Sequence, residues 1–258
     1  MGIIACKFGG TSTANADMFK RIRAILASDP DRRYVVLSAP GRDGTREKVT
    51  DMLYKGDIAG VAGRFAAMAR DLNVEMDFET ELRRAARESE AALLSRGEYL
   101  CARLFSRWIG IPFVDAADVI RFDAHGRPDA PGTRAALRRM AARFPRAVIP
   151  GFYGSDPHRR VVIFPRNGSD ITGALVAAGV GASLYENWTD VPGLMTGDPE
   201  KDPEARVIPE ITYADMRRAS RSGARVLHPD CLDAVEAAGI PTRIRCTMRP
   251  DLPGTLIH

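Results

Sequence analysis

The chain has 258 residues, of which 45% are hydrophobic and 27% are charged, and its formal net charge is +4. These proportions are typical of a soluble globular protein, and no apolar run approaches the roughly 20 residues that a membrane span needs. The apolar run after Met1 is too short for a signal peptide and leads directly into Lys7. We therefore expect one large cytoplasmic domain and no membrane-spanning segment.

The excess positive charge does not follow a nucleic-acid-binding pattern. Arginines are dispersed in helical stretches such as 134–146, where aromatic side chains for base stacking are scarce. A solvated helix face accounts for them, and the surplus charge also suits an anionic small substrate. We expect no nucleic-acid partner.

The cysteines and histidines are not spaced as metal ligands. No CxxC pair and no zinc-type histidine spacing occurs among Cys6, Cys101, Cys231, Cys246, His125, His158, His228 and His258. The cysteines are expected to be reduced and mostly buried, as in a cytoplasmic protein. No metal bound directly by the protein is expected.

The first predicted strand, residues 3–8, ends in a turn with two glycines, and an amphipathic helix begins near Asn15. Gly9 and Gly10 let backbone N–H groups approach an anion closely. The helix N-terminus and Lys7 add positive charge. The pattern is consistent with a phosphate-binding turn and also with a plain tight turn, because strand–glycine turns are common.

The next elements complete a strand–helix–strand unit. Apolar residues at helical spacing predict a helix of about three turns over 18–26, and residues 33–38 form a second buried strand. In a right-handed unit of this kind the strands are parallel, so the turns at 9–10 and 38–40 lie at the carboxyl ends of neighbouring strands. Open α/β sheets bind ligands at that edge.

Residues 49–107 have a helical pattern almost throughout. Breaks are predicted near Gly56, Gly60, Asn73 and Gly97. The last break separates helices at 89–94 and 100–108, which places Glu98 at a helix start. There an acidic side chain complements the helix dipole.

The second half continues the alternation of strands and helices. Strands are predicted at 111–114, 147–152, 160–164, 183–188 and 241–246, and helices at 133–143, 171–180, 213–222 and 229–238. The strand at 160–164 leads into a second glycine turn at 165–170, which precedes an Ala- and Gly-rich helix. Two anion-binding turns at one edge indicate a polyphosphate or a phosphoryl group in transfer.

Four motifs occur in a fixed order: KFGGTS at 7–12, RNGSD at 166–170, WTDVPG at 188–193 followed by Asp-Pro at 198–199, and GARVLHP at 223–229. Together they resemble the catalytic domain of the aspartokinases, in the amino acid kinase family, over residues 3–257. The resemblance implies an α/β fold, a three-layer αβα sandwich around a mostly parallel sheet. It also implies an acceptor-binding part at 1–150 and a nucleotide-binding part at 151–258 within a single domain.

The reaction implied by this resemblance moves the γ-phosphoryl group of ATP to the β-carboxylate of L-aspartate. It would be the first step of a pathway to lysine, threonine and methionine, with Mg²⁺ carried by ATP and a homodimer as the assembly. A carboxylate acceptor is already ionised at neutral pH, so the protein needs no strong general base. Its task is to hold two anions together and to neutralise the transferring group.

The same resemblance assigns roles to individual residues. Lys7 and Asp170 are the catalytic pair, since the carboxylate orients the lysine. Phosphate and nucleotide contacts are assigned to Lys7, Phe8, Gly9, Gly10, Ser38, Gly168, Ser169, Thr189, Asp190, Met195, Arg225 and Val226. Acceptor contacts are assigned to Thr50, Glu98, Arg166 and Ser169. In this assignment Glu98 meets the substrate ammonium, which replaces the helix-dipole interpretation, and Arg166 binds the α-carboxylate as a bidentate pair.

Four positions depart from the pattern of many family members. Met195 stands where tyrosine is usual, Glu200 where arginine is usual, Arg225 where lysine is frequent, and Asn167 in place of the first glycine of a pair. Asn167 must therefore adopt glycine-like angles, which asparagine tolerates better than most residues. These departures concern the ATP site more than the class of reaction.

Two alternatives stay open at this stage. One is a related kinase for another small carboxylate or amino acid, and the other is a weakly active homologue that acts as a sensor or assembly partner. The regulatory ACT domains of most aspartokinases have no counterpart in these residues, so we expect no feedback by lysine or threonine from this chain alone.

Overall fold

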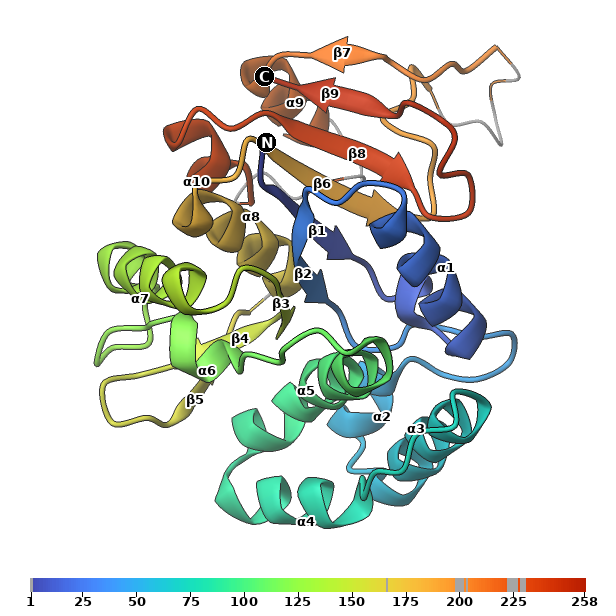
Figure 1. Cartoon of the computed structure of the whole chain (residues 1–258), viewed down its shortest axis with the longest axis vertical. Coiled ribbons are helices and arrows are strands. Elements are labelled where there is room, and N and C mark those ends of the chain that lie inside the picture. The colour runs from blue at the N-terminus through green and yellow to red at the C-terminus, as the bar shows by residue number, and fades with distance from the viewer. Residues whose placement is uncertain (1, 166, 198–201, 203, 222–226, 228–230) are drawn as a thin grey trace.

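The computed structural model describes residues 2–165, 167–197, 202, 204–221, 227 and 231–258 (Figure 1). Within them, seven strands form one sheet in the order β3-β2-β1-β6-β8-β9-β7. Their bounds are β1 (Ile4–Phe8), β2 (Arg32–Leu37), β3 (Ala147–Pro150), β6 (Leu184–Thr189), β7 (Glu210–Ile211), β8 (Thr242–Cys246) and β9 (Thr255–Ile257). Strands β3, β2, β1, β6 and β8 are mutually parallel, while β9 runs antiparallel to β8. The predicted mostly parallel sheet is confirmed.

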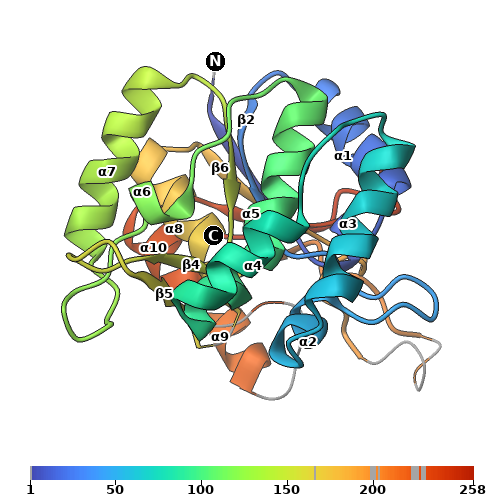
Figure 2. The same cartoon turned by 90° about the horizontal axis from the view of Figure 1, so that it is seen from below.

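Helices cover both faces of this sheet, which gives the predicted three layers (Figures 1 and 2). One face is covered by α1 (Ala16–Ala27) and α5 (Glu90–Ile109), and α2 (Val49–Tyr54), α3 (Ile58–Asp71) and α4 (Glu79–Glu88) pack in turn against α5. The other face packs against α6 (Ala116–Val119), α7 (Ala130–Arg143), α8 (Gly168–Val180), α9 (Tyr213–Arg221) and α10 (Leu232–Ala237). None of the helices in the described part of the chain is both long enough and apolar enough to cross a membrane.

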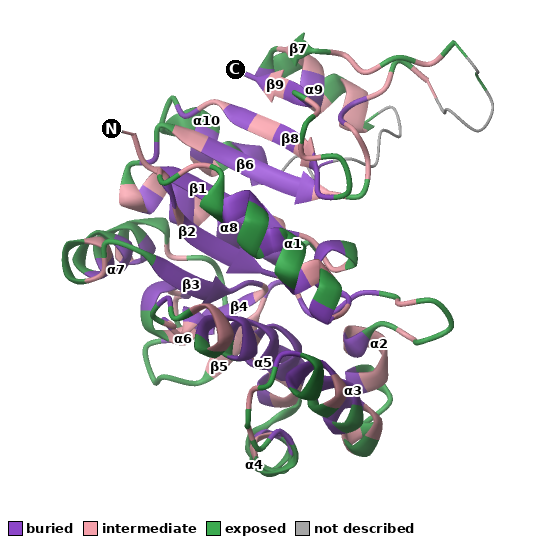
Figure 3. Cartoon of the chain, turned by 45° about the vertical axis from the view of Figure 1, so that its right-hand side comes forward, coloured by how far each residue is buried: buried purple, intermediate pink, exposed green. Residues whose placement is uncertain are grey.

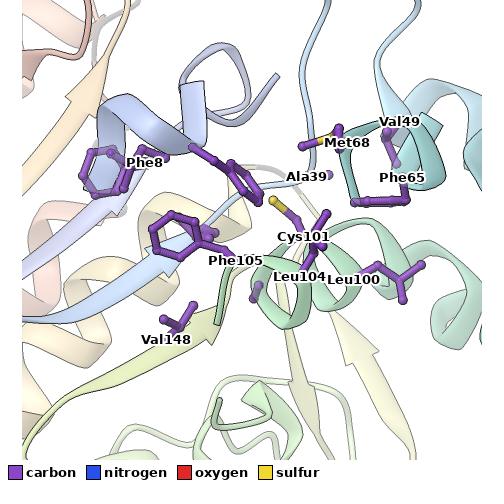
Figure 4. Packing of buried hydrophobic residues seen from close by; sticks show 14 of the residues in the cluster. Phe8, Ala39, Val49, Phe65, Met68, Leu100, Cys101, Leu104, Phe105 and Val148 are labelled. Atoms are coloured by element: carbon purple, nitrogen blue, oxygen red, sulfur yellow. The ribbon is translucent and has the colours of Figure 1, made fainter. Parts of the chain in front are cut away.

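The strands are buried on both faces because their apolar residues alternate between two cores. Along β1, Cys6 and Phe8 join the core under α1 and α5, whereas Ala5 joins the core under α7 and α8. Figure 3 shows the central strands buried, and Figure 4 shows Phe8 and Phe105 in the first core. This two-sided burial is typical of parallel sheets.

A largely buried ionic network centres on Glu186 of β6, next to the core that contains Cys6 and Phe8. The Glu186 carboxylate accepts two hydrogen bonds from Arg32, at 2.7 and 3.1 Å, one from Arg245 at 3.2 Å and one from the Trp188 indole at 3.0 Å. Burial raises the pKa of Glu186, but these cations and hydrogen bonds outweigh it and lower the pKa below its ordinary value. Cys6 also donates to this carboxylate.

The predicted first helix and the strands at 33–38, 183–188 and 241–246 are confirmed by α1, β2, β6 and β8. All four cysteines are buried, as expected. Helix α7 begins at Ala130, three residues before the predicted Thr133, because Asp129 caps it by accepting a hydrogen bond from the Gly132 N–H and a proline occupies its first turn.

The predicted helix break at Gly97 is wrong. Helix α5 is continuous over 20 residues, so Glu98 lies in its middle and not at a helix start. A Cβ atom at Gly97 would lie 2.8 Å from the Ala39 Cβ, so the glycine allows the helix to pass close to the end of β2. The break at Gly60 is also wrong, because this residue belongs to the first turn of α3, where its N–H donates to the Asp57 cap.

Two predicted strands are not strands of the seven-stranded sheet. Residues 111–114 form only a single bridge, between Phe113 and Val148. The strand at 160–164 is present as β5 (Val161–Ile163), but it pairs antiparallel with β4 (Tyr153–Ser155) in a separate two-stranded sheet. Neighbouring strands joined by a short polar loop readily form such a hairpin. The second glycine turn therefore does not follow a strand of the main sheet.

Candidate active site

The turns after β1 and β2 are joined into one surface. The Thr13 hydroxyl lies 3.1 to 3.3 Å from the carbonyl oxygens of Gly9, Gly10, Ser38 and Ala39. The Gly41 N–H donates to the Gly10 carbonyl at 2.8 Å, and a Cβ atom at Gly41 would lie 2.5 Å from the Gly10 carbonyl carbon. Only a glycine at position 41 permits this contact, which fixes the two turns against each other.

The first turn of α8 forms the opposite wall. Asn167 caps this helix in the left-handed conformation, with φ 48°, as its place in the motif required. A Cβ atom at Gly168 would lie 2.8 Å from the Phe152 Cα, so the backbone there approaches its neighbours closely. The N-terminus of α8 consequently presents backbone N–H groups and partial positive charge at this point.

The two walls enclose one cavity of about 480 Å³ at the carboxyl ends of β1 and β2. It brings together predicted residues from both halves of the chain, namely Lys7, Gly10, Ser38, Thr50, Glu98, Gly168, Ser169 and Asp170. In the sheet, β1 lies between β2 and β6, so the chain leads from β1 to one side and returns later on its other side. Open α/β sheets bind ligands at the edge where such connections diverge.

The Lys7 ammonium forms an ion pair with Asp170 inside this cavity. The Nζ to Oδ1 distance is 2.6 Å, and the two side chains are 9% and 18% exposed. Asn187 donates to the same carboxylate oxygen at 2.9 Å, and the Tyr185 hydroxyl donates to the Asp170 backbone carbonyl at 3.3 Å. Lysine, carboxylate and amide are thus held in one network between β1, α8 and β6.

Glu98 presents a buried carboxyl group to the same cavity. The residue is 5% exposed, and its Oε2 atom has no hydrogen-bond partner. Burial raises the pKa of Glu98 to about 8, although hydrogen bonds from the backbone N–H groups of Ala39 and Glu98 and the charge of Lys7 oppose the rise. A buried unpaired carboxyl oxygen costs free energy, and a cationic ligand group would satisfy it.

Several cavity residues were not predicted. Arg42, Lys48 and Asp51 line it from the segment after β2, and Phe152 lines it from the loop after β3. Their position after the carboxyl ends of strands was the available signal for them. Asn187 was also missed, although it is a polar residue in a buried strand and pairs in register with Lys7.

Other predicted residues lie elsewhere. The Phe8 ring is fully buried and stacks on Trp188 with ring centres 5.7 Å apart, so only its backbone is available to a ligand. Thr189 and Asp190 do not line the cavity but adjoin the first turn, where Thr11 donates to Asp190 at 3.1 Å.

Met195 forms a bridge with Val207. It lies outside the cavity wall. Arg166, Glu200, Arg225 and Val226 lie outside the described residues.

The fold and this cavity define an α/β protein with a ligand site at the carboxyl edge of its parallel sheet. The model of the amino acid kinase family matches residues 2–246, and the chain belongs to that family. It is 32% identical to aspartokinase 3 of Bacillus subtilis, an alignment that covers 97% of this chain and 62% of the relative.

Solved structures agree with this placement. The aspartate kinase of Clostridium acetobutylicum superposes with a TM-score of 0.94 at 37% identity, over 99% of this chain and 63% of that protein. Aspartokinase III of Escherichia coli in complex with aspartate and ADP superposes with a TM-score of 0.87 at 28% identity, over 99% and 64%. The chain therefore spans a little under two thirds of the length of these relatives.

Proposed function

We propose that this chain catalyses ATP-dependent phosphorylation of the β-carboxylate of L-aspartate, giving 4-phospho-L-aspartate. The observation that carries the proposal is the single cavity in which the Lys7–Asp170 ion pair, the N-terminus of α8 and the unpaired carboxyl oxygen of Glu98 meet. Relatives named aspartokinase and a relative solved with aspartate and ADP support the choice of substrates.

The acceptor is proposed to lie between Glu98, Thr50 and Ser169. The free oxygen of Glu98 would accept a hydrogen bond from the α-ammonium group, and the Arg166 guanidinium would bind the α-carboxylate. An α-amino acid presents both groups at fixed spacing, so this pair of residues favours aspartate over a simple dicarboxylate. The β-carboxylate then points toward the phosphoryl group.

Lys7 and the amides of both walls are proposed to stabilise the transferring phosphoryl group. The chemistry requires neutralisation of negative charge between two anions and their alignment, and no proton needs to leave the acceptor. Asp170 holds Lys7 at 2.6 Å and so fixes the position of the ammonium group before substrates bind. The nucleotide would extend toward Thr189, Asp190, Met195 and the segment with Arg225 and Val226.

Mg²⁺ is proposed to arrive on the phosphate oxygens of ATP, which are the hard ligands that this ion prefers. The Asp170 carboxylate is already engaged by Lys7 and Asn187, so a cation bound to it would compete with that network. A homodimer in the cytoplasm is part of the same proposal, by analogy with the family.

Trapping of the acyl phosphate tests the proposal directly. The purified chain is incubated with ATP, Mg²⁺, L-aspartate and hydroxylamine, and the aspartyl hydroxamate is quantified together with ADP. Formation of hydroxamate with aspartate and not with glutamate or succinate supports the assignment. ADP formation with another carboxylate in place of aspartate would identify a related kinase, and no calorimetric binding of ATP would identify a non-catalytic homologue.

A further inference from the structure

Arg64 is a buried cation of α3, 6% exposed, that connects three separate segments. Its guanidinium donates to the carbonyl oxygen of Ala14 at 3.1 Å and to those of Gly41 and Glu47. Ala14 follows the turn after β1, Gly41 lies in the turn after β2, and Glu47 precedes Lys48, the residue that caps α2. One side chain therefore links the turns after β1 and β2 to the start of α2.

The surroundings of Arg64 indicate that stabilising the fold in general does not explain why a buried arginine stands at this position. Among the described residues no carboxylate lies within ion-pair distance of it, and its Nε atom has no hydrogen-bond partner. Burial lowers the pKa of the guanidinium. A buried charge without a counter-ion costs free energy that its hydrogen bonds only partly offset, so an apolar side chain would serve packing better.

The segment that Arg64 binds is the acceptor side of the cavity wall. Gly41 and Glu47 are close to the two ends of the loop at 41–48, and that loop supplies Arg42 and Lys48 to the cavity. Thr50 and Asp51 follow directly in the first turns of α2 and also line it. Arg64 itself is not among the residues that line this cavity.

We propose that Arg64 is a positioning residue, which binds carbonyl groups near both ends of the 41–48 loop and thereby holds the acceptor side of the active site in place. The inference rests on the proposed function, since Thr50 and Glu98 identify this side as the acceptor side. The planar fork of arginine suits three separated carbonyl groups, whereas a lysine ammonium cannot span them.

Steady-state kinetics of Arg64→Lys test the proposal, with Arg32→Lys as the matched control. Arg32 is equally buried, at 5% exposed, but it lies at the amino end of β2 and binds Glu186. For Arg64→Lys we expect the KM for aspartate to rise about tenfold, equivalent to ~1.4 kcal/mol. The kcat should stay within about threefold and the KM for ATP within about twofold. For Arg32→Lys both KM values should be unchanged while the unfolding midpoint falls.

Limited trypsin digestion gives a readout that does not depend on catalysis. Arg42, Arg46 and Lys48 are trypsin sites within the loop. Well below the unfolding midpoint, cleavage at these sites, mapped by mass spectrometry, should accelerate about tenfold in Arg64→Lys and remain at the wild-type rate in Arg32→Lys. Arg64→Gln replaces the lysine variant if the latter does not fold.

The outcomes separate the two hypotheses. Wild-type protein that forms no aspartyl hydroxamate refutes the proposed function, and the digestion then decides the role of Arg64. An unchanged aspartate KM, an equal rise in both KM values, or unchanged cleavage of the loop in the Arg64 variants would overturn the positioning role.

Discussion

Replacement of Glu98 by glutamine should make the protein more stable at alkaline pH. Because burial raises the pKa of Glu98 in the folded state from 4.5 to about 8, the folded state holds a proton that the unfolded chain releases near the ordinary value. The stability contributed by the protonated carboxyl is complete below pH 4.5 and is lost as the pH rises through 8. At ~1.36 kcal/mol per pH unit the loss is at most about 5 kcal/mol.

Urea unfolding of the wild type and of Glu98→Gln, at pH 5 and at pH 9, measures this effect. Glutamine stays neutral, so the free energy of unfolding of the variant relative to the wild type should increase by up to about 4 kcal/mol between the two pH values, since part of the loss is already present at pH 5. Glu90→Gln, an exposed acid on the same helix, controls for the substitution itself. A difference between Glu98→Gln and wild type that is the same at both pH values would refute the reasoning.

Three further predictions concern the site and the core. Lys7→Met should lower kcat by about 10²- to 10³-fold in the hydroxamate assay, because a preorganised charge is lost. The control Lys20→Met, on an exposed helix surface, should leave kcat unchanged. A kcat of Lys7→Met near the wild-type value would remove Lys7 from the mechanism. Gly97→Ala should destabilise the protein by about 1–3 kcal/mol in urea, since its methyl group meets Ala39 at 2.8 Å, and an unchanged midpoint would mean that the helix shifts freely. Glu186→Gln should cost about 3–5 kcal/mol by thermal or urea unfolding, because the buried Arg32 and the partly buried Arg245 lose their counter-ion. A loss below about 1 kcal/mol would show that these arginines find other partners.

The two segments that line the cavity were predictable from local sequence because each of them has a local cause. The buried strand with Lys7, the glycines that follow and the capped helix near Asn15 are contiguous, and so are Asn167 and the small residues of α8. The rule that parallel strands expose their carboxyl ends at one edge places the first segment at the cavity. It does not place the second, because α8 follows β5, which belongs to the separate two-stranded sheet.

The errors have a different origin, since they depend on which segments pair or pack with one another. Gly97 looks like a helix break in sequence, but close passage of α5 over Ala39 requires a glycine there. The strand at 160–164 was predicted without its partner, and its pairing with β4 depends on the hairpin that joins them. Arg64 has no sequence signal at all, because its partners are backbone carbonyls of three other segments.

The ion pair at the centre of the site joins the two halves of the chain, because Lys7 belongs to β1 and Asp170 to α8. A polypeptide cut in the exposed loop at 124–127 would leave these two residues on different fragments. Neither fragment alone would carry the pair, and turnover in a mixture would require their reassociation. Under the proposed kinase function, the chain is a starting point for a split-enzyme reporter, in which the rate of product formation measures how often two fused proteins meet.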